Sequence, residues 1–279
     1  MPVIIDSQVH VWAAETPGRP WYSATAHLPS PFGFEDLRAE MDIAGVARAV
    51  LGPPGWEGGR PDLALQGAAR HPGRFAVMGR VPLDDPDACA SLARWKARPG
   101  MLGIRLAFQK ERESAWLRDG TADWFWPQAE KFAIPVMVFA PGQNAAIAEI
   151  ARGHPGLRLI VDHMGLARET DGAAAARIES LIPLADHANV HVKVSSVPLY
   201  STEPYPYRNL HRALGRLIGA FGPRRAFWGT DLTRIWTLVE SYRQCVTLFT
   251  EELDFLTAED LDWVMGRGIA QCLEWKLGD

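Results

Sequence analysis

Features that would place this chain in a special class are scarce in its sequence. Its 279 residues include three cysteines, Cys89, Cys245 and Cys272, which form no CxxC pair and no spacing typical of a metal site. Such a scattered, odd set predicts buried, reduced thiols and a cytoplasmic location. Apolar runs are short, with IPVMVFA among the longest, so we expect no membrane-spanning segment. The chain enters an apolar strand without a basic leader, so no secretory signal is expected.

An excess of one charge is also absent. The net charge is −4 and charged residues make up 22% of the chain. These values do not indicate nucleic acid or an anionic membrane as a partner. The glycine patterns GxGxxG and GxxxxGKS, which cradle phosphates, do not occur. The remaining expectation is a globular protein that acts on a small molecule.

Eight short apolar stretches recur, each followed by a segment with helical spacing. Their β-branched or continuous apolar character is typical of strands buried on both faces. The predicted strands cover residues 3–9, 47–52, 74–81, 102–107, 134–140, 158–163, 190–195 and 225–231. The predicted helical segments cover residues 34–45, 85–97, 122–133, 144–153, 173–188, 236–253 and 257–275. Gly45 is a predicted helix C-cap, and Thr257 with Asp260 resembles a capping box.

Eight strand–helix alternations predict one α/β domain, a (β/α)8 TIM barrel that spans residues 1–279. The alternative is an open, doubly wound sheet. Two segments that follow strands, residues 12–34 and 196–209, are too long for simple turns. Long loops after barrel strands border the active site, so we expect both segments at the functional face.

Polar residues stand where these buried strands end, which is the face that carries active sites in barrels. They are Asp6, Gln8 and His10 on the first strand, Arg80 on the third, Arg105 on the fourth, Asp162 and His163 on the sixth, Lys193 and Ser195 on the seventh, and Thr230 and Asp231 on the eighth. Phe139 ends the fifth. Each polar residue alone has a structural explanation, as a hydrogen-bonded strand end or an ion-pair partner. Their convergence on one barrel mouth is what predicts a site.

The segments that carry these residues resemble the amidohydrolase superfamily. IIDSQVHVW, LGIRLAF, IPVMVFA, LIVDHMG, VHVKVS and FWGTDL occur in the family's order. They are most similar to its branch of lactonases and decarboxylases, which includes 2-pyrone-4,6-dicarboxylate lactonase. The resemblance covers nearly the whole chain and implies a distorted (β/α)8 barrel. By analogy alone, it also makes a homodimer one expected assembly.

The resemblance implies a metal-ligand pattern from which this chain departs. In metal-using members the first strand carries His-x-His, and here the pair is Gln8 and His10. The ligand position of the fifth strand falls on Phe139, whereas His163 and Asp231 match the ligands of the sixth and eighth strands. A catalytic metal site needs about three good protein ligands. We therefore expect no resident metal; the alternative is one divalent ion, such as zinc or manganese, held by His10, His163 and Asp231.

Without a metal, hydrolysis of an ester or lactone needs a base for water and donors for the oxyanion. Asp231 is the expected base, with His163, His10 and Lys193 as the other catalytic residues. Gln8 is expected to donate a hydrogen bond to the substrate. The resemblance implies that Arg105 binds a substrate carboxylate, a task that suits its planar group.

Further residues are expected near the substrate. Arg80, Phe139 and Tyr200 complete the predicted binding set, with Lys110, Arg112 and Arg208 as additional cations of unassigned direction. The aromatic residues of the two long loops fit either a planar substrate or simple packing of the loops; they are Trp12, Trp21, Tyr22, Tyr200, Tyr205 and Tyr207. The sequence leaves both explanations open.

Three functions are consistent with these residues. The expected one is a metal-independent hydrolase of a lactone or related ester of a small carboxylated molecule. The second is a metal-dependent, non-oxidative decarboxylase of an aromatic or unsaturated acid, against which Gln8 and Phe139 count. The third is a catalytically silent binding protein or partner subunit, since loss of two ligand positions is what such a relative would show.

Overall fold

A computed structural model of the chain describes residues 3–22, 26–28 and 31–277. Residues 1–2, 278–279, and 23–25 and 29–30 of the predicted first loop lie outside this description. One parallel sheet organises the fold, with its strands in the sequential order β1 to β8. They are β1 (Ile5–Val9), β2 (Arg48–Leu51), β3 (Phe75–Gly79), β4 (Met101–Ala107), β5 (Val136–Phe139), β6 (Leu159–Val161), β7 (Val190–Ser195) and β8 (Ala226–Gly229).

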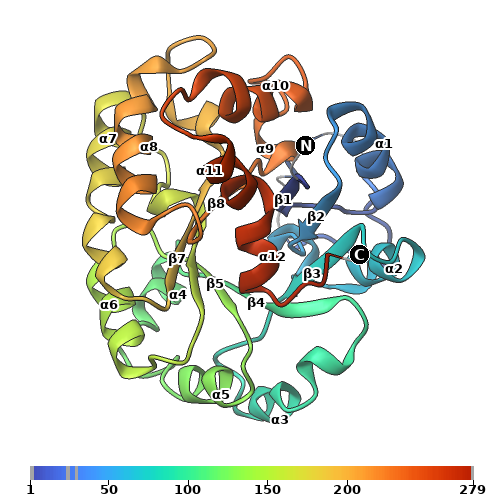
Figure 1. The fold of residues 1–279 in the computed structure, drawn as a ribbon. Helices are drawn as coiled ribbons and strands as arrows, with labels where there is room; N and C mark the ends of the chain where they lie inside the picture. The colour runs from blue at the N-terminus through green and yellow to red at the C-terminus, as the bar shows by residue number, and fades with distance from the viewer. Residues whose placement is uncertain (1–2, 23–25, 29–30, 278–279) are drawn as a thin grey trace.

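The sheet closes into a nearly complete barrel with helices outside it (Figure 1). The Asp231 N–H donates to the Gln8 carbonyl at 2.9 Å, which links the end of β8 back to β1. Sequential strand order excludes the doubly wound sheet, whose order reverses at a switch point. The (β/α)8 prediction is therefore confirmed, and each predicted strand matches an observed one within a few residues.

Helices follow most strands and cover the outer face of the barrel (Figure 1). The described α-helices are α1 (Phe34–Ala44), α2 (Asp62–Arg70), α3 (Cys89–Leu92), α4 (Glu111–Ala115), α5 (Phe125–Lys131), α6 (Asn144–Gly153), α7 (Asp171–Glu179), α8 (Arg208–Phe221), α9 (Leu232–Ile235), α10 (Tyr242–Thr247), α11 (Ala258–Asp262) and α12 (Gly268–Cys272). None of the described helices is long and apolar enough to cross a membrane.

Helix ends follow local chemistry. Gly45 caps α1 with φ 79°, a left-handed conformation that costs glycine little. Thr257 and Asp260 form the predicted capping box of α11. The helix predicted over residues 85–97 is instead the short α3 flanked by 3₁₀ turns. The long segment 196–209 contains a 3₁₀ helix at Val197–Tyr200 and runs into the start of α8.

The barrel interior contains both apolar and charged side chains. One apolar cluster includes Met137, Phe227 and Ile269 of α12. Arg105 is in register with Met137, and Lys193 with Phe227. Side chains in register on parallel strands share a face, so both cations point into the barrel. Buried cations need partners, and both pair with the buried carboxylate of Asp162.

Candidate active site

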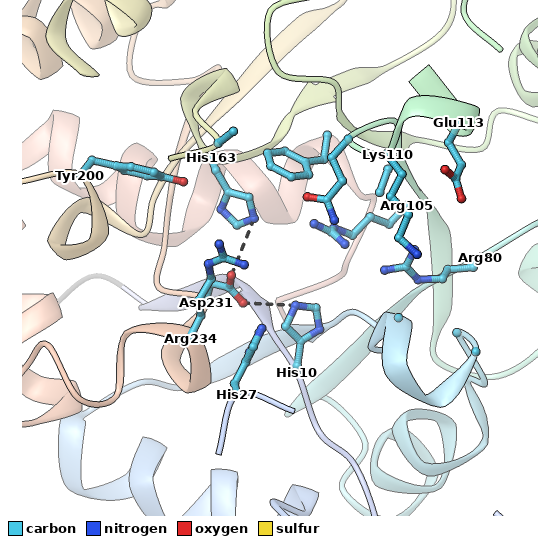
Figure 2. Close-up of a pocket in the computed structure, with 17 residues that line it drawn as sticks. His10, His27, Arg80, Arg105, Lys110, Glu113, His163, Tyr200, Asp231 and Arg234 are labelled. Atoms are coloured by element: carbon cyan, nitrogen blue, oxygen red, sulfur yellow. Dashed lines mark ion pairs between the residues drawn. The ribbon is translucent and has the colours of Figure 1, made fainter. Parts of the chain in front are cut away.

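A cavity of about 320 Å³ opens at the carboxyl ends of the strands (Figure 2). Seven of the nine predicted site residues line it: His10, Arg80, Arg105, Phe139, His163, Tyr200 and Asp231. The other two, Gln8 and Lys193, lie buried behind its wall. The structure thus brings the predicted set together, in two layers that the sequence did not distinguish.

Three strand ends turn sharply at the cavity. His163, Ser196 and Asp231 have φ angles of 51°, 59° and 54°, in the left-handed region. Non-glycine residues adopt this conformation at a cost, and such residues cluster at functional sites. The turns direct His163 and Asp231 into the mouth of the barrel instead of continuing the strands.

Asp231 and His10 form an ion pair on the cavity wall. His10 Nε2 lies 3.2 Å from Asp231 Oδ1, and His163 Nε2 lies 3.9 Å from Oδ2. Burial alone would raise the pKa of the Asp231 carboxyl, but the charge and hydrogen bond of His10 hold that pKa well below its usual range. Asp231 is therefore ionised at neutral pH.

His10 is oriented by the backbone. Its Nδ1 lies 2.5 Å from the Gly52 carbonyl oxygen, so Nδ1 carries a proton and donates it. Nε2 is thereby directed at Asp231, and the predicted donation from His10 to a substrate carbonyl has no free N–H in this arrangement.

His163 is held as a neutral ring. Burial lowers its pKa to about 3. Its Nε2 lies 3.0 Å from Gln8 Nε2, and its Nδ1 lies 2.8 Å from Ser195 Oγ. Both ring nitrogens thus have hydrogen-bond partners within the protein. The role of His163 as a donor to substrate stays a prediction, and this arrangement does not favour it.

A charge cluster supports the wall from behind. Lys193 Nζ lies 2.6 Å from Asp162 Oδ1, and Arg105 Nε lies 2.7 Å from Oδ2. Burial would raise the pKa of Asp162, but the charges of Lys193 and Arg105 outweigh it and lower the pKa to about 2. Burial also lowers the pKa of Lys193. Lys193 is wholly buried, so any effect on substrate acts through its neighbours.

Asp6 has a structural role. It accepts hydrogen bonds from the Thr230 N–H at 3.0 Å, the Thr230 hydroxyl, and Tyr242 Oη at 2.7 Å. Its burial raises its pKa, which these donors partly offset. Since Thr230 precedes Asp231, Asp6 fixes the position of the candidate base.

Arginines form the opposite side of the cavity (Figure 2). Arg80 Nε donates to the Pro53 carbonyl at 3.0 Å, and its stem packs on Gly59, where a Cβ would clash. Burial and the charge of Arg105 lower the pKa of Arg80 to about 10. Within the described residues, no hydrogen bond reaches the terminal nitrogens of Arg80 or Arg105. These groups can bind an anion.

The remaining predicted residues divide between cavity and surface. Lys110 lines the cavity, whereas Arg112 pairs with Asp84 and Arg208 with Glu252 on the surface. Tyr200 is the one aromatic residue of the two loops, in their described parts, that lines the cavity. Two of the others support the packing explanation, since Trp12 is buried in the core and Tyr205 bonds Thr247, whereas Tyr22 is exposed.

Sequence reasoning missed His27 and Arg234. His27 lies within the predicted first loop, packs on Trp56 at 4.7 Å between ring centres, and bonds Thr233 Oγ1 through Nδ1 at 2.9 Å. Figure 2 shows it pointing toward Asp231 and His10. Burial lowers its pKa to about 4. A lone histidine in an expected active-site loop was the available signal.

The donor set does not fit the metal that the resemblance implies. Gln8 faces His163 Nε2, and Phe139 packs edge-on against the His163 ring, with 5.4 Å between ring centres. Among the described residues, no group of three His, Cys, Asp or Glu side chains is placed to hold a metal ion. His10 and Asp231 alone fall short of the three ligands typical of catalytic zinc.

Comparisons with known proteins agree with this architecture. The amidohydrolase family model matches residues 5–268. An L-fucono-1,5-lactonase of Burkholderia ambifaria is 29% identical over 81% of this chain and 79% of its own length. One from Burkholderia multivorans is 26% identical over 96% and 95%. A zinc-bound amidohydrolase from Burkholderia multivorans superposes with a TM-score of 0.81 at 21% identity, covering 98% of this chain and 99% of that one. The chain belongs to the amidohydrolase family and is a hydrolase.

Proposed function

We propose that this hydrolase opens a lactone or related ester of a small carboxylated molecule, with Asp231 activating water and no resident metal. The observation that carries the proposal is one cavity with an ionised carboxylate on one side and two arginines on the other. The relatives named as L-fucono-1,5-lactonases support lactones as the substrate class.

The geometry supports a simple sequence of steps. Asp231 accepts a proton from water as the water oxygen attacks the carbonyl carbon. The oxyanion that forms lies in a cavity lined by Arg105 and Arg80, whose charges stabilise it. When the ring C–O bond breaks, the proton returns from Asp231 to the leaving alkoxide. The products are a carboxylic acid, which ionises, and an alcohol. His10 keeps Asp231 ionised and in position.

A carboxylate on the substrate fits the charge balance of the cavity. Asp162 pairs with both Arg105 and Lys193. Arg80 donates to a backbone carbonyl, and no carboxylate of the described residues lies within ion-pair distance of it. Burial, and then repulsion by the guanidinium group of Arg105, lower the pKa of Arg80. A bound carboxylate would relieve this repulsion and accept hydrogen bonds from both groups.

Arg80→Gln should lower kcat/KM for a carboxylated lactone by about 10- to 100-fold, the loss of one charge-assisted hydrogen bond. Steady-state kinetics of acid release would measure it. Arg112→Gln is the matched control, because Arg112 pairs with Asp84 away from the cavity. Equal kinetics of Arg80→Gln and wild type would contradict the assignment of Arg80.

Activity should also survive removal of metal ions. After dialysis against a chelator, we expect lactone hydrolysis within about twofold of the untreated rate, since the donor set does not fit a three-ligand site. Metal analysis of the same sample would accompany the assay. Stoichiometric metal, with lactone hydrolysis lost on chelation and restored by one divalent ion, would refute metal independence.

A further inference from the structure

We infer that Lys193 and Gln8 together prevent a metal from binding at this site. Lys193 orients the Gln8 amide so that its N–H group points at the one ring-nitrogen lone pair of His163 that could bind an ion. The inference deepens the proposed function, on whose metal independence it rests.

Lys193 fixes which end of the Gln8 amide faces His163. An ammonium group has donors only, so the Gln8 atom at 2.5 Å from Lys193 Nζ must be the acceptor Oε1. Asp162, at 2.6 Å, holds Lys193 in place. The Gln8 NH₂ group is then turned toward His163 and cannot exchange places with Oε1 without facing the ammonium group.

The amide in turn fixes the tautomer of His163. Gln8 Nε2 is a donor, so His163 Nε2 at 3.0 Å must accept. The ring proton therefore sits on Nδ1, which donates to Ser195 Oγ at 2.8 Å. An imidazole nitrogen binds a metal through the lone pair that it uses here to accept the amide N–H.

The other potential ligand atoms are close to positions that a metal would require. Tetrahedral zinc with bonds of about 2.0–2.1 Å places its ligand atoms about 3.3 Å apart. His10 Nε2 and Asp231 Oδ1 are 3.2 Å apart, and His163 Nε2 lies 3.9 Å from Asp231 Oδ2. As they stand, no three of these described side chains are placed to hold an ion, and the site also lacks a free lone pair on His163. Removing the amide should supply it.

The first test uses the unaltered protein. Nitrogen-15 NMR of the histidine rings should show His163 as the neutral Nδ1–H tautomer, with Nε2 accepting a hydrogen bond. An Nε2–H tautomer would overturn the inference without reference to any catalytic assay. Failure of lactone hydrolysis alone would refute the proposed function and leave this result standing.

The second test measures zinc. Wild type should bind zinc weakly by calorimetry and retain little after dialysis. Gln8→Ala frees His163 and should raise zinc affinity about tenfold, because zinc binding no longer has to break the hydrogen bond from the Gln8 amide to His163 Nε2. Gln8→His places a second imidazole next to His163, which the Gln8 side chain contacts, and should retain about one zinc per chain after dialysis.

The control is Gln109→His, which adds an imidazole to the cavity wall but leaves Gln8 in place. It should bind zinc no better than wild type. Circular dichroism checks that each variant is folded. Stoichiometric zinc in the wild type, or folded Gln8 variants without any gain in affinity, would overturn the inference. If the variants do not fold, the NMR result on wild type decides.

Discussion

Asp231→Asn should lower kcat for lactone hydrolysis by about 10²- to 10⁴-fold, the range expected when a general base is lost. The amide keeps the shape of the carboxylate but cannot accept the proton of water. It also loses the ion pair with His10 Nε2, at 3.2 Å in the wild type. The measurement is single-turnover and steady-state release of acid, with circular dichroism to confirm that the variant is folded.

Asp254→Asn, which changes a surface carboxylate, is the matched control and should keep wild-type kinetics. If Asp231→Asn turned over normally, Asp231 would not be the base. If neither wild type nor the variant opened any carboxylated lactone tested, a catalytically silent relative would become the better description.

The pH profile adds an independent check on Asp231. Because His10 holds the pKa of Asp231 well below the usual range of an aspartate, the base stays ionised as the pH falls toward 4. The acid limb of kcat/KM should therefore lie below about pH 4. A limb between pH 6 and 7 would point to a different group as the base.

Much of the fold could be predicted because the strands are buried on both faces. Such strands read as continuous apolar runs, and their number and alternation with helices indicate a barrel. Helices α2, α4, α8 and α9 were missed. The α8 segment carries Leu210, Leu214, Leu217 and Phe221 at helical spacing, so the signal was present just beyond a loop rich in proline and tyrosine.

The sequence predicted most of the residues of the site, but not the directions of their side chains. Position at a strand end predicted that His10, His163 and Asp231 share a cavity. It could not predict that Gln8 turns away from that cavity, because its direction is set by Lys193, 185 residues away in the sequence. The left-handed backbone conformations of His163 and Asp231 likewise depend on packing against distant residues, so the local sequence does not predict them.

The largest effect on stability is expected at Asp162. Its carboxylate neutralises both Lys193 and Arg105 in the barrel interior, at 2.6 and 2.7 Å. Asp162→Asn would leave two buried cations without a counter-charge, and breaking a buried pair in this way costs about 3–5 kcal/mol. Urea denaturation at pH 7 would measure the free energy of unfolding. Asp42→Asn is the control: its carboxylate pairs with Arg74 at 2.6 Å on the surface, where such pairs contribute about 1 kcal/mol or less.

The pH dependence of this difference follows from the pKa of Asp162. Folding lowers that pKa from 3.8 to about 2, so the folded state favours the ionised form. The stabilisation is fully present above about pH 4 and is lost as the pH falls through about 2, below which the carboxyl is protonated in both states. The gap between wild type and Asp162→Asn should therefore be widest near neutral pH and narrow below pH 4. A gap that is small at pH 7, or that widens in acid, would show that Lys193 and Arg105 are neutralised by another group.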